Sequence, residues 1–164
     1  MEQWGRHELW EGCLEWELPG KCTDSRTLRD LPQNQEVFLA EGKDSFLFDL
    51  MEMVDEPDVA QAARVHWNEL AETNELEARD VAAKAGKVPE VSGGAMRTVP
   101  VVVGMQGDVR VWLALLRLPE HKTDVVISWN EAEWAARDER ESEATFLRIL
   151  ASVRMHDLAF LNAQ

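Results

Sequence analysis

The feature that most constrains this chain is a pair of apolar, β-rich runs joined by a short turn. Residues 99–105 and 109–118 are rich in valine and leucine, and the Gln-Gly-Asp turn at 106–108 is a hairpin signal. A third such run, residues 124–129, alternates along its length and places Trp129 in the expected core. Because connections this short cannot carry a crossover, neighbouring strands must pair antiparallel. The second half of the chain therefore predicts an antiparallel sheet.

Alternation also predicts strands in the first half. Within residues 8–19, apolar residues and glutamates alternate up to the turn at Pro19-Gly20, which is typical of a half-buried strand. Residues 35–39 form a second, short candidate. Residues 45–54 fit either a strand or a helix that would place Asp49 beside Glu52. The run is short and rich in phenylalanine, and turn signals bound it, so a strand is favoured.

Three helices are expected between and after these strands. The sequence Asp-Glu-Pro-Asp at 55–58 is a helix start, and an apolar stripe continues to about residues 70–73. His66 lies near that stripe and is interpreted as a satisfied, partly buried histidine. Residues 78–85 predict a second helix, and a third begins at Ser142. This order predicts one α+β domain over residues 1–164, a mainly antiparallel sheet packed between helices.

The charge of the chain restricts its partners. It has 31 acidic and 17 basic residues in 164, a net charge of −14. Such a field repels phosphate backbones and anionic lipid and attracts basic protein surfaces, so we expect neither nucleic acid nor a membrane as partner. Two cysteines, Cys13 and Cys22, and an N-terminus unlike a signal peptide indicate reduced thiols in a cytosolic or nuclear protein.

No pattern of catalytic residues is present. The chain has no phosphate-binding glycine loop and no Gly-x-Ser-x-Gly, and its four histidines lack partners at metal-ligand spacing. We therefore expect a binding protein without catalytic residues, metal or cofactor, and not an enzyme.

Acidic residues concentrate in residues 41–58, where seven acids face Lys43 alone. Acidic runs usually form solvent-exposed faces. The further acidic stretches at 69–80 and 131–143 are interpreted as such exposed faces. Asp49 and Glu52 differ because they interrupt an apolar run. A carboxylate beside apolar groups suits a protein interface, where charge determines register and association rate.

Several segments, taken together, resemble one family. They are Leu-Trp-Glu-Gly at 9–12, the segment 28–38 with its Gln-Glu-Val-Phe, residues 44–52, and Thr-Asp-Val-Val-Ile-Ser at 123–128. Over about residues 9–160 the chain is similar to the Ran guanine-nucleotide release factors, the Mog-type proteins. Residues 74–98 fit that pattern poorly, and Glu11 and Gln33 depart from it.

The resemblance implies a PsbP-like fold and the small GTPase Ran as partner. It further implies release of Ran's guanine nucleotide in support of nuclear protein import, by a monomer in the nucleus and cytoplasm. An acidic pair that matters for Ran contact falls by position on Asp49 and Glu52. The expected contact residues are completed by Glu36 and Asp44 as flanking groups, together with Asp30 and Gln35. The alternative is an acidic adaptor or chaperone-like module for another basic protein.

Overall fold

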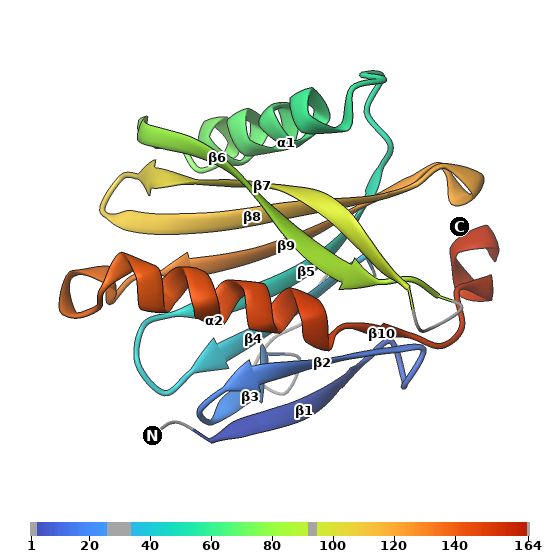
Figure 1. The fold of residues 1–164 in the computed structure, drawn as a ribbon, viewed down its shortest axis with the longest axis horizontal. Coiled ribbons are helices and arrows are strands. Elements are labelled where there is room, and N and C mark those ends of the chain that lie inside the picture. The colour runs from blue at the N-terminus through green and yellow to red at the C-terminus, as the bar shows by residue number, and fades with distance from the viewer. Residues whose placement is uncertain (1–2, 26–33, 92–94, 164) are drawn as a thin grey trace.

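A seven-stranded sheet forms the centre of the structure (Figure 1). The computed structural model describes residues 3–25, 34–91 and 95–163. Every strand pairing in the sheet is antiparallel, which confirms the predicted sheet, its hairpin and the strand reading of residues 45–54. In spatial order the strands are β3 (Cys22–Asp24), β4 (Gln35–Ala40), β5 (Ser45–Glu52), β9 (Thr123–Glu131), β8 (Val109–Leu118), β7 (Met96–Gln106) and β6 (Ala78–Pro89).

A small second sheet packs against one face of the first. It consists of β1 (Trp4–Leu9), β2 (Leu14–Pro19) and β10 (Arg154–Met155). The single strand predicted for residues 8–19 is therefore wrong in extent. The backbone turns between β1 and β2 with positive φ angles at Trp10 and Glu11, 47° and 55°, which the sequence pattern does not indicate because neither residue favours that region.

Helix α2 (Glu139–Ser152) lies beside the small sheet and in front of the large one, whereas α1 (Val59–Thr73) packs on the opposite face (Figure 1). The α2 side holds a core that includes Trp16, Trp112 and Phe146, and Trp129 is 3% exposed there, as predicted. On the α1 side, Trp67 packs over apolar side chains of β7, β8 and β9. The helix–sheet–helix layering confirms the predicted α+β sandwich.

Helix α1 begins at Val59, directly after the segment 55–58 that the sequence predicts as its start, so Pro57 and the acids of that segment precede the helix. Asp58 is its N-cap, and its carboxylate accepts hydrogen bonds from the backbone amides of Ala60 and Gln61. The short 3-10 helices are Pro119–His121, Trp134–Ala136 and Ala159–Ala163. Within the three described ranges, no helix is long and apolar enough to cross a membrane.

The helix predicted for residues 78–85 is wrong, because this segment forms the first part of β6. Ala82–Pro89 pair with Met96–Val103 of β7, and a bulge separates Arg79 from Ala82. Pairing with a neighbouring strand overrides the helix propensity of an alanine-rich segment. Gly86 does not end a helix either. A β-carbon there would lie 2.7 Å from Leu150 Cδ1, so glycine permits the close approach of α2.

Candidate functional site

Strand β5 carries Asp49 and Glu52, but it directs them to opposite faces of the sheet. Side chains alternate along a strand. Phe48 and Leu50 are buried on the α2 side, so Asp49 belongs to the α1 side and Glu52 to the other. Three residues of strand also separate their Cα atoms by about 10 Å. Asp49 is half-buried and Glu52 is exposed, so they form two separate points and not a side-by-side pair.

A cavity of about 300 Å³ lies between α1 and the strands β4, β5, β8 and β9. Asp49 lines it beside Gln35, whose Nε2 donates to Asp49 Oδ1 at 2.7 Å. The cavity therefore holds one half-buried carboxylate among amide, hydroxyl and apolar groups. The remaining lining residues are Asn34, Leu47, Met51, His66, Glu69, Leu70, Thr73, Leu113, Val126, Ser128 and Asn130.

The environment of Asp49 disfavours its charged form. Burial raises its pKa from the ordinary 3.8 to about 6, because removal from water destabilises a carboxylate. The hydrogen bond from Gln35 and the nearby His66 act in the opposite direction and offset the burial only in part. At neutral pH Asp49 is thus a poorly solvated anion. Groups of this kind concentrate at functional sites.

Replacing Asp49 with asparagine should raise the free energy of unfolding by about 1–2 kcal/mol at pH 7.5. The pKa is higher in the folded than in the unfolded chain, so the wild type loses stability as pH rises from about 4 through 6. Two pKa units set an upper limit of about 3 kcal/mol. An asparagine can still accept from Gln35 but carries no charge.

Urea unfolding of both proteins at pH 7.5 and pH 4.0 measures this effect. The difference should be largest at pH 7.5 and should close toward pH 4.0. Glu52→Gln, at an exposed position, is the control and should change little. An Asp49→Asn variant that is less stable than the wild type at pH 7.5 would contradict the proposed environment.

A buried ionic network lies behind the cavity. His66 Nε2 is 2.8 Å from Asp124 Oδ2, which confirms His66 as a satisfied, buried histidine. Arg117 donates from Nε to Asp124 Oδ1 at 2.8 Å and from Nη2 to Oδ2 at 3.1 Å. Burial by itself would raise the pKa of Asp124, but the hydrogen bonds from Arg117 and His66 bring it below its ordinary value.

The same network fixes the connector between β5 and α1, residues 53–58. Arg117 also donates to the carbonyl oxygens of Val54 and Glu56, and Asp124 Oδ2 accepts from the Val54 amide at 3.2 Å. The connector follows directly after Glu52. Its position on the sheet therefore depends on Arg117 and Asp124.

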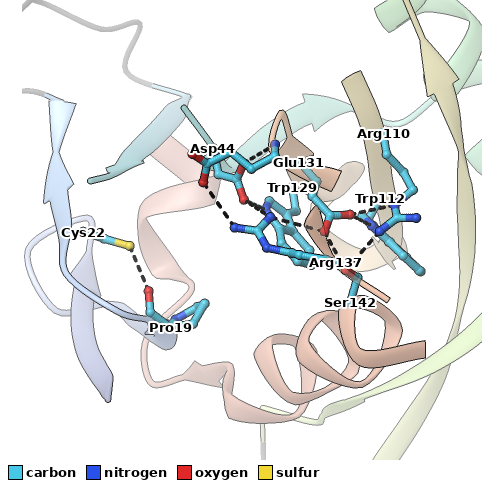
Figure 2. A network of polar contacts seen from close by, with 10 residues as sticks. Pro19, Cys22, Asp44, Arg110, Trp112, Trp129, Glu131, Arg137 and Ser142 are labelled. Carbon is cyan, nitrogen blue, oxygen red and sulfur yellow. Dashed lines mark hydrogen bonds and ion pairs between the residues drawn. The ribbon is translucent and has the colours of Figure 1, made fainter. Parts of the chain in front are cut away.

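Asp44 belongs to a different network, on the other side of the sheet (Figure 2). It is 3% exposed and accepts hydrogen bonds from Trp129 Nε1 at 3.1 Å, the Glu133 amide at 3.1 Å and Arg137 Nη1 at 2.6 Å. Arg137 also reaches Glu131 at 3.3 Å. The carboxylate of Asp44 is therefore engaged inside the protein and does not flank Asp49.

Glu36 is also directed away from the cavity. It pairs with Phe48 across β4 and β5 and so lies on the α2 side, where its carboxylate accepts from the Trp10 amide at 3.0 Å. The expectation that Glu36 flanks Asp49 is thus corrected by strand alternation. Asp30 lies outside the described residues. Of the predicted contact residues, the structure brings together Asp49 and Gln35, and it leaves Glu52 exposed at the end of β5.

Sequence reasoning missed other residues of the cavity. Ser128 and Asn130 come from β9, and Glu69 comes from α1. Ser128 interrupts the apolar run 125–129 on the same face as Leu47, and that interruption was the available signal. The meeting of His66 with Asp124, 58 positions apart, has no local signature.

Comparisons with known proteins converge on one family. The family model described as Ran-interacting Mog1 protein matches residues 7–132, which include β5, α1, β8 and β9. A Dictyostelium discoideum protein described as a probable ran guanine nucleotide release factor is 25% identical over 95% of both chains. The nuclear import protein MOG1 of Saccharomyces cerevisiae is 31% identical over 75% of this chain and 64% of its own length.

Solved structures support the same assignment. The crystal structure of the Saccharomyces cerevisiae Ran-binding protein Mog1p matches 98% of this chain and 99% of its own, with a TM-score of 0.71 and 23% identity. The solution structure of PsbP from Synechocystis sp. PCC 6803 matches 95% of this chain and 94% of its own, with a TM-score of 0.56 and 11% identity, which confirms the PsbP-like fold. This chain belongs to the family of Ran-interacting Mog1 proteins.

Proposed function

We propose that this chain binds the small GTPase Ran and promotes release of its guanine nucleotide, in support of nuclear protein import. Membership of the Ran-interacting family supports this, as do relatives described as release factors and nuclear import proteins. The protein acts as a monomer in the nucleus and cytoplasm. It carries out no chemistry of its own and changes how tightly its partner holds a ligand.

The observation that carries the proposal is the poorly solvated carboxylate of Asp49 in the cavity beside α1. A basic group of a partner would relieve the cost of that desolvation, because an opposite charge nearby favours the ionised form. The net charge of −14 would increase the rate of encounter with a basic surface.

The mechanism follows from how such GTPases hold nucleotide. A lysine, backbone amides and Mg²⁺ surround the phosphates. A protein that loosens the nucleotide must bind the open form of the GTPase more tightly than the closed form. Asp49 and Glu52 would do so by competing with phosphate for basic groups. Because they lie on opposite faces of β5, the contact surface extends around the end of this strand.

Asp49→Ala and Glu52→Lys should each weaken binding to Ran at least about tenfold, since removing one partner of a desolvated charge pair costs about 2–5 kcal/mol. Isothermal titration calorimetry with purified Ran measures the affinity. Glu41→Lys is the matched control for Glu52→Lys, because it makes the same charge change at an exposed site near the other end of β5. Unchanged affinity in both site variants would rule out this contact.

Release of a fluorescent guanine nucleotide from Ran tests the second half of the proposal. The wild-type chain should accelerate release, and Asp49→Ala should require at least about ten times more protein for the same rate. If the chain binds Ran but does not accelerate nucleotide release, it is a Ran-binding protein and not a release factor.

A further inference from the structure

A second cavity, here called the hairpin groove, lies on the other face of the sheet from the one that Asp49 lines. It has a volume of about 350 Å³ and is bounded by the tip of the β6–β7 hairpin, the end of β8, the β8–β9 turn and β10, which lie at one end of the sheet (Figure 1). Its apolar wall includes Pro89, Leu116, Leu118 and Met155. The last three belong to the core on the α2 side, so the wall is held in place by the fold.

The rim of the hairpin groove carries an exposed apolar side chain. Val91 lines the groove and is 45% exposed. Of the residues that the structure describes, two other large hydrophobic side chains are exposed, Met96 and Leu76. Met96 pairs with Pro89 at the same hairpin tip, whereas Leu76 precedes β6 and lies near the other end of the hairpin. Exposed apolar side chains that gather beside a concave apolar wall are typical of a protein interaction site.

The charged groups of the hairpin groove favour a basic neighbour. Glu90 and Glu120 line it, and neither carboxylate has an ion pair within the described parts of the chain. Arg97 is the one cation among the described lining residues, and its Nη2 donates to the carbonyl oxygen of Arg117 at 2.5 Å. Two carboxylates against one guanidinium leave the lining net negative. Charges of this kind at the rim of an interface attract a basic partner and accelerate association.

The hairpin groove is continuous with the surface around Glu52. Glu52 pairs with Thr123, and Thr123 pairs with Leu118, so the three residues form one row across β5, β9 and β8. Strands in a sheet are about 4.8 Å apart, which places the Cα atoms of Glu52 and Leu118 about 10 Å apart. A protein interface of ordinary size covers about 800 Å² on each partner, a patch of roughly 16 Å radius. A partner that contacts Glu52 therefore reaches the groove.

We infer that the hairpin groove receives one aliphatic side chain of Ran, next to a lysine or arginine that faces Glu90 and Glu120. Pro89, Val91 and Leu118 surround the aliphatic side chain, and the basic residue stays at the rim. An apolar centre with a charged rim is the usual composition of a protein interface. This contact is separate from those of Asp49 and Glu52, and the identity of the partner as Ran rests on the proposed function.

Surface plasmon resonance with immobilised Ran separates the apolar from the charged part of this contact. Val91→Asp should weaken binding about three- to tenfold, mainly through faster dissociation, because it places a charge in the apolar centre. Leu76→Asp is the matched control, because it makes a similar change at an exposed apolar residue far from the groove, and it should bind as the wild type does. Circular dichroism spectra confirm that each variant is folded.

Glu120→Lys should weaken binding about three- to tenfold through slower association, and raising the salt concentration should reduce the difference from the wild type. Glu41→Lys makes the same charge change at an exposed site near the other end of β5 and controls for the change in net charge. If Glu41→Lys slows association as much as Glu120→Lys does, the rim of the groove has no specific role and the inference is wrong.

Photo-cross-linking tests the position of the contact directly. Met96 is exposed at the hairpin tip and is not among the described lining residues, so replacing it with the photoreactive residue benzoylphenylalanine leaves the groove open. Irradiation of the complex should join this position to Ran, whereas the same replacement of Leu76 should give no cross-linked product. Absence of a cross-link from position 96 would contradict the inference.

The outcomes separate the two proposals. If Glu52→Lys weakens binding to Ran while Val91→Asp and Glu120→Lys bind as the wild type does, the groove contact is rejected and the proposed function stands. If the wild type itself does not bind Ran, the proposed function is rejected, and the groove contact with Ran is rejected with it.

Discussion

Replacing Glu131 with alanine should lower the free energy of unfolding by about 3–5 kcal/mol. Glu131 is fully buried and accepts hydrogen bonds from Arg110 Nε at 2.7 Å, Trp112 Nε1 at 3.0 Å and Ser142 Oγ at 2.5 Å (Figure 2). Without it, the guanidinium of Arg110, which is 8% exposed, would remain buried without its anion. Urea unfolding followed by circular dichroism measures the loss.

Glu133→Ala is the matched control for this prediction. Its carboxylate contacts Arg137 at 3.5 Å, but its side chain is 48% exposed, so its removal should cost less than about 1 kcal/mol. The pKa of Glu131 is lowered, because hydrogen bonds from Arg110, Ser142 and Trp112 outweigh its burial. Its contribution is therefore complete at pH 7 and is lost as pH falls below about 4.5. Similar losses in both variants would contradict the importance of the network.

Arg117→Met should have a comparable effect, about 3–5 kcal/mol, because it leaves Asp124 fully buried with His66 and the Val54 amide as its remaining partners among the described residues. The substitution also removes both hydrogen bonds from Arg117 to the connector at residues 53–58. Hydrogen exchange at the connector amides should therefore accelerate more than exchange at the centre of β8.

The double variant Arg117→Met, Asp124→Leu distinguishes a lost ion pair from lost packing. Replacing both members of a buried pair by apolar residues is often neutral for stability. The double variant should therefore recover a large part of the stability that Arg117→Met loses, while its connector stays unprotected against exchange. No recovery would indicate that packing of the arginine, and not its charge, is the main contribution.

The parts of the fold that could be predicted are those with a local signature. The hairpin of β7 and β8 follows from a turn between two apolar runs, and the start of α1 follows from Asp58. The alternation of side chains between the two faces of β5 could also be predicted once a strand was favoured for residues 45–54. Applied to Asp49 and Glu52, it already implies opposite faces, although the resemblance treated them as a pair.

The parts that could not be predicted depend on distant partners. Strand β6 has a helical composition and becomes a strand only because β7 is beside it. The burial of Asp44 and Glu36 depends on Arg137 and on the Trp10 amide, which are 93 and 26 positions away. In a chain with so many acids, composition does not distinguish a carboxylate that holds the fold together from one that meets a partner. Burial and hydrogen bonding make that distinction.

The bulge in β6 has a consequence for the protein at high concentration. β6 is one of the two edge strands of the large sheet, and edge strands can pair with another chain. The bulge between Arg79 and Ala82, with a φ of 55° at Asp80, interrupts the regular spacing of its backbone groups, and Lys84 beside it is held by Glu143 of α2 at 2.6 Å. Both features oppose the addition of a further strand. They protect this edge of the sheet from edge-to-edge aggregation.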